Sequence, residues 1–166
     1  MNLYFLVPAL ALIGLLQTTL VPHISLWGAK PNLQLLVVIA WTLIGGSQEG
    51  LWWALIGGLW LDLLGGTPFG ASALALLVAS YLVGVGASTI FRERLVIRIL
   101  SGLTAGLVYG LVLLILLALT GRPTTWSVTF FRVIVPDAIY NAVLLPAVYV
   151  VMLALGRRAA ARRLDL

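Results

Sequence analysis

Asp62 is the residue whose type and setting most suggest chemistry. Its carboxylate lies within an apolar, glycine-rich stretch, EGLWWALIGGLWLDLLGG over residues 49–66. The chain is 62% hydrophobic with a mean hydropathy of +1.14, so we expect this carboxylate to lie inside a lipid bilayer. A charge at the centre of a bilayer costs about 3 kcal/mol or more, so such a group is normally paired, faces a cavity or takes part in function.

The spacing of the neighbouring small residues places Asp62 on a distinct helix face. Residues four apart on a helix lie on the same side. One such set reads Gly50, Ala54, Gly58, Asp62 and Gly66. Small residues let two helix backbones approach closely in a membrane, so we expect this face to contact protein rather than lipid.

Catalysis and cofactor binding have little support in the sequence. Asp62 and Asp137 could act as a carboxylate pair, but two carboxylates alone are a weak signal. His23 follows Pro22 and is expected to be an interfacial side chain rather than a base. The chain has no cysteine, no metal-ligand spacing and no phosphate-binding glycine loop, so we expect neither a metal nor a cofactor.

Composition sets the class of protein. Only 9% of the 166 residues are charged, against about a quarter in soluble domains, which excludes a soluble protein. Apolar runs of membrane-spanning length predict an all-α polytopic membrane protein with one domain over residues 1–166. The net charge of +5 is concentrated at the ends of these runs, where basic residues set topology, so we expect no nucleic-acid partner.

We predict six transmembrane helices and two cytoplasmic termini. The predicted spans are about 3–22, 31–46, 50–66, 70–91, 98–120 and 132–155. Pro31 and Asn32 open the second, where a proline near a helix start is tolerated. More basic residues fall on one side, which is therefore expected to be cytoplasmic. That side carries Arg92, Arg94, Arg98, Arg157, Arg158, Arg162 and Arg163, and the other carries Lys30, Arg122 and Arg132.

Most polar groups inside the predicted spans fall in the outer half of the membrane. They are Gln17, Asp62, Arg132, Asp137 and Asn141. One interpretation is a satisfied internal network that fixes helix register, with one of the two acids facing Arg132. The other is a cavity that opens outward to a partner helix or a ligand. The sequence does not decide which acid would pair with Arg132.

Two further patterns concern packing and contacts at the membrane surface. Gly102, Gly106 and Gly110 form a double small-xxx-small repeat, for which packing within the chain is the default and homodimerisation the alternative. Pro146 is expected to kink the last span. The basic segment 92–98 and the basic tail are expected to set topology, with contact to anionic lipid or a cytoplasmic partner as the alternative.

The order of these features resembles the MreD family of bacterial rod shape-determining proteins. The resemblance rests on LVPHISLWGAKPNLQLLVVIAWTLIGG at 20–46 and EGLWWALIGGLWLDLLGGTPFGASALALLVASYLVG at 49–84. In the first, a proline–asparagine pair opens the second span; in the second, the glycine-rich span ends in Asp-Leu-Leu-x-Gly. The segment from Asp137 to Asn141 also resembles the last span of the family, so the resemblance covers nearly the whole chain.

The resemblance implies a non-enzymatic subunit of the cell-elongation machinery in the bacterial cytoplasmic membrane. It implies binding to the transmembrane helix of MreC, and a larger complex with MreB, RodA and a penicillin-binding transpeptidase. It also implies a fold like the six-helix S component of energy-coupling-factor vitamin transporters. A vitamin-binding S component is therefore the alternative function, although the spans offer few hydrogen-bonding side chains for a polar ligand.

Overall fold

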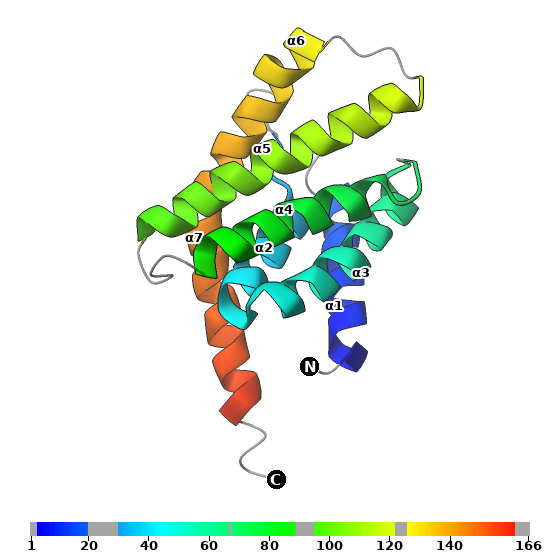
Figure 1. The fold of residues 1–166 in the computed structure, drawn as a ribbon. Helices are drawn as coiled ribbons and strands as arrows, with labels where there is room; N and C mark the ends of the chain where they lie inside the picture. Colours follow the sequence, from blue (N-terminus) through cyan, green and yellow to red (C-terminus); the bar gives the residue numbers. More distant parts are fainter. Residues whose placement is uncertain (1–2, 20–29, 67, 89–94, 122–125, 162–166) are drawn as a thin grey trace.

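The fold is a bundle of helices (Figure 1). The computed structural model describes residues 3–19, 30–66, 68–88, 95–121 and 126–161, and all regular structure within them is helical. The elements are α1 (Leu3–Thr19), α2 (Leu33–Gly45), α3 (Ser47–Gly65), α4 (Ala71–Ser88), α5 (Leu95–Leu119), α6 (Trp126–Thr129), the π-helical η2 (Phe130–Ile134) and α7 (Val135–Ala161). Because α6, η2 and α7 follow one another without a break, they form one long helix. The predicted all-α class is confirmed.

Two of these helices are long and apolar enough to cross a membrane, Leu95–Leu119 and Trp126–Gly156. Shorter apolar helices cover Val7–Thr19, Leu33–Gly45 and Ala71–Gly86. The last helix begins at Trp126, six residues before the predicted start at 132. The residues between Trp126 and Pro136 contain no helix breaker, which accounts for the earlier start. That all six long helices cross the bilayer remains a prediction.

The turn signals in the sequence have clear structural counterparts. Asn32, expected with Pro31 to open the second span, is the N-cap of α2, and its side chain accepts a hydrogen bond from the Leu35 amide at 3.0 Å. Gly66 ends α3 with a φ of +67°, a left-handed conformation that favours glycine. The π turn of η2 ends at Ile134, two residues before Pro136, whose nitrogen cannot donate the hydrogen bond that a regular helix needs there.

The core is built around α2, which contacts α1, α3, α4, α5 and α7. Its fully buried side chains include Leu35, Leu36 and Ile39. Figure 1 shows α3, α4 and α5 lying side by side, with α7 crossing α5. This arrangement leaves α2 enclosed by its neighbours.

The glycine faces predicted from spacing are packing surfaces within the chain. A Cβ on Gly58 would collide with the backbone of Ala73 in α4, and one on Gly50 would collide with the Thr42 side chain in α2. The repeat on α5 packs along α7. There Gly102 faces Ala142, Gly106 faces Ala138, and Gly110 faces Ile134.

Candidate functional site

Most of the polar groups singled out from the sequence gather at one end of the bundle. At this end α1, α3 and α5 finish while α2, α4 and α7 begin, and we call it the network end. The side chains concerned belong to two clusters. One surrounds Asp62, and the other surrounds the chain segment 30–33 that leads into α2.

Asp62 caps the start of α4 from the neighbouring helix. Its carboxylate is 5% exposed and accepts hydrogen bonds from the amides of Gly70 at 2.9 Å, Ser72 at 2.9 Å and Ala73 at 3.3 Å. The first amides of a helix have no partner within the helix, and the helix dipole favours a negative charge there. Three donors therefore offset the cost of burying this acid, and they fix where α4 starts against α3.

The segment leading into α2 is held from both sides. From α1, the Gln17 amide donates to the Pro31 carbonyl at 3.3 Å and accepts from the Leu33 amide at 2.6 Å. From α7, Asp137 accepts from the Lys30 amide at 2.8 Å. A second α7 contact joins the Asn32 amide to the Asn141 side chain, which accepts the hydrogen bond at 2.9 Å. Peptide groups outside a helix need such partners where water is scarce.

Tyr109 of α5 links the two clusters. Its side chain is partly buried, and its phenol interacts with the side chains of Ser72, beside Asp62, and of Asn32, in the held segment. Together with Tyr109, the predicted polar residues thus join α1, α2, α3, α4, α5 and α7 at this end. The arrangement matches an internal network, in which main-chain amides take the place that the sequence had suggested for Arg132.

Arg132, Gly58 and Gly66 lie differently from the rest of the predicted cluster. The Arg132 side chain is exposed, and none of the carboxylates that the structure describes pairs with it. Gly58 is buried against α4, whereas Gly66 is exposed and serves as the end of α3. The predicted face of α3 is therefore buried from Gly50 to Asp62 and exposed only at Gly66.

The basic residues predicted to be cytoplasmic are only partly described. Arg98, in the first turn of α5, lies over the ring of Tyr149 in α7, 4.1 Å from its centroid, which is a cation–π contact. Arg157 and Arg158 lie in the last turns of α7. Arg92 and Arg94 lie outside the described residues.

The sequence reasoning missed Tyr109 and two further polar features. Gln34 of α2 is fully buried, and neither its amide nitrogen nor its oxygen has a hydrogen-bond partner in the described part of the chain. Its nitrogen abuts Gly57 of α3, so this glycine makes room for it. At the opposite end, Glu49 accepts from the Trp41 indole at 3.0 Å, and Trp41 stacks on Trp53. Gln34 could have been found as a polar residue within the apolar run that follows Asn32.

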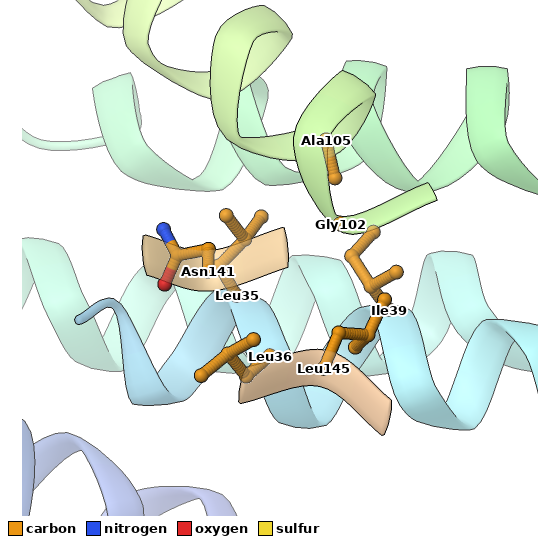
Figure 2. A pocket seen from close by; sticks show the side chains of 7 residues that line it. All are labelled: Leu35, Leu36, Ile39, Gly102, Ala105, Asn141 and Leu145. Carbon is orange, nitrogen blue, oxygen red and sulfur yellow. The ribbon is translucent and has the colours of Figure 1, made fainter. Parts of the chain in front are cut away.

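A small pocket lies where α2, α5 and α7 meet (Figure 2). Its walls are Leu35, Leu36, Ile39, Gly102, Ala105, Asn141 and Leu145, and Asn141 is its only polar side chain. The space inside it is too narrow to hold a water molecule. Ligand pockets usually have about 300–1,000 Å³ and several convergent polar groups. Among the described residues no three His, Cys, Asp or Glu side chains are placed to hold a metal ion.

The comparison with known families decides the identity of the chain. The model of one family, the rod shape-determining protein MreD, matches residues 1–159. The chain belongs to the MreD family. Members are non-enzymatic membrane proteins that determine rod shape, and the resemblance found in the sequence is confirmed. Searches of curated proteins and of solved structures gave no match.

Proposed function

We propose that this protein is a non-enzymatic subunit of the bacterial rod complex in the cytoplasmic membrane. It binds the transmembrane helix of MreC and helps to organise peptidoglycan synthesis, in a larger assembly with RodA, a penicillin-binding transpeptidase and MreB. The observation that carries this proposal is the family match over residues 1–159. The two helices long enough to span a membrane agree with it.

The internal network supports a scaffold. The side chains of Asp62, Gln17 and Asn141 bind the chain's own backbone, so they fix the relative positions of the helices rather than reach toward a substrate. A bundle with a fixed arrangement presents a constant outer surface to its partners. The face from Gly50 to Asp62 is covered by α2 and α4, so we propose that partners bind to surfaces other than this one.

The orientation follows from the basic residues. Both termini are cytoplasmic in this proposal, and the network end faces outward. The basic residues at the start of α5 and the end of α7 would then meet the anionic lipids of the inner leaflet.

A vitamin-binding S component is the alternative. The pocket between α2, α5 and α7 offers one polar side chain and too little room for a vitamin. The polar groups of the network end, which suggested an outward cavity in the sequence, bind the chain's own amides instead. These observations favour the scaffold.

Affinity purification from native membranes in mild detergent tests the proposal. The tagged protein is expected to recover MreC, identified by mass spectrometry, and a tagged unrelated six-helix protein serves as control. Recovery of an ATPase pair with a coupling membrane subunit, and no MreC, would overturn the scaffold in favour of the S component.

A further inference from the structure

The first eight residues of the last helix, Trp126 to Val133, are exposed or half-buried, with no buried side chain among them, and we call them the projecting end. Exposed fractions are 52% for Trp126, 48% for Val128, 70% for Phe131 and 45% for Val133. Arg132 is exposed among them. Thr129 and Phe130 are half-buried, but the exposed positions point in different directions around a helix, so the exposure is not confined to one lipid-facing side.

The packing of the bundle explains this exposure. The contacts of α6 with other described elements are essentially with η2, the next turn of the same helix. The first buried side chain is Ile134, which packs on Gly110 of α5. In Figure 1, α6 stands at the tip of the last helix, beyond the bundle.

The length of this helix places the projecting end at the membrane surface. The apolar stretch Trp126–Gly156 has 31 residues. At 1.5 Å per residue it is about 46 Å long, whereas the hydrocarbon core of a bilayer is about 30 Å thick. Tilt can absorb part of the difference, but the aromatic side chains at the end still reach the headgroup region, where acyl chains do not cover them.

The charge of Arg132 indicates which kind of partner could bind the projecting end. Copies of a membrane protein insert in the same direction, so a symmetric pair has its two-fold axis along the membrane normal. Two projecting ends that met in this way would bring Arg132 against Arg132 at the same depth. The repulsion disfavours a second copy and favours a partner that supplies a carboxylate, which a guanidinium binds through two parallel hydrogen bonds.

We infer that the projecting end is a docking site for the outer end of a partner's transmembrane helix that carries a carboxylate. Arg132 pairs with that carboxylate, while Phe131 and Trp126 pack on the partner's apolar side chains. This inference rests on the proposed function, in which the partner is MreC. It locates the contact on α6 and η2, away from the buried glycine face of α3.

Co-purification of MreC with the full-length protein tests the inference. Arg132→Glu should reduce the recovery of MreC by about tenfold or more, because it replaces an attractive charge pair with a repulsive one. Phe131→Ser should also reduce it. Phe69→Ser is the matched control, because Phe69 is 76% exposed at the same end but lies between α3 and α4, and it should leave recovery unchanged. Unchanged melting temperatures confirm that the variants are folded.

The outcomes separate the inference from the proposed function. If the wild type recovers MreC and Arg132→Glu and Phe131→Ser recover it equally well, the docking site is wrong while the proposed function stands. If the wild type recovers none, the proposed function fails first. A photo-crosslinking residue at position 131 gives a second readout. Adducts with the outer end of the MreC transmembrane helix support the docking site, whereas adducts of phospholipid mass alone, or a crosslinked dimer of the chain, overturn it.

Discussion

At the level of single residues, Asp62 acts as a helix cap rather than as a reactive group. Replacing it with leucine would leave the amides of Gly70, Ser72 and Ala73 without their acceptor. An unsatisfied buried donor costs about 1–3 kcal/mol. Asp62→Leu should therefore lower the melting temperature in detergent, followed by tryptophan fluorescence. Asp62→Asn keeps one acceptor oxygen and should lower it less. Equal melting temperatures for the wild type and Asp62→Leu would show that these bonds do not stabilise the fold.

Replacing Gln34 is expected to raise the stability of the protein rather than lower it. Its side-chain amide is buried without a hydrogen-bond partner among the residues that the structure describes, so replacing it with an apolar group of similar shape removes a desolvation cost and no hydrogen bond. Gln34→Met is expected to raise stability by about 1–3 kcal/mol. Gln17→Met is the matched control, since the Gln17 amide makes two hydrogen bonds and its loss should destabilise the protein. Thermal unfolding of both variants in one detergent measures the difference, and a lower melting temperature for Gln34→Met would contradict the prediction.

At the scale of helices, the contact of α5 with α7 depends on glycine. A Cβ on Gly106 would lie 2.7 Å from the Cα of Ala138, so the two helices would have to separate. Overpacking of this kind costs about 1–3 kcal/mol, so Gly106→Ala should lower the melting temperature. A Cβ on Gly86 of α4 would meet nothing within 4 Å. Gly86→Ala should therefore raise stability by up to about 1 kcal/mol through helix propensity. A stabilising Gly106→Ala would show that α5 and α7 are less closely packed than described.

The helices and their contacts show which parts of the structure can be predicted from the sequence. Hydrophobic runs and breakers predicted the helices, and the i, i+4 spacing predicted that Gly58 and Gly106 contact other helices, because both signals are local. The partner of Asp62 was not predictable, because backbone amides are present at every position and only the fold brings those of α4 to it. The exposure of Arg132 depends on where the bundle ends, which the sequence pattern does not show.

For the whole molecule, the orientation in the membrane is open to direct measurement because the chain contains no cysteine. A cysteine in place of Phe69, exposed at the network end, should react in intact spheroplasts with a maleimide that does not cross membranes. A cysteine in place of Gln48, exposed at the opposite end, should react only after the membrane is opened. The reason is the excess of arginine near the Gln48 end, which is retained on the cytoplasmic side. The reverse labelling would invert the protein and place the projecting end in the cytoplasm, where the outer end of a partner helix could not reach it.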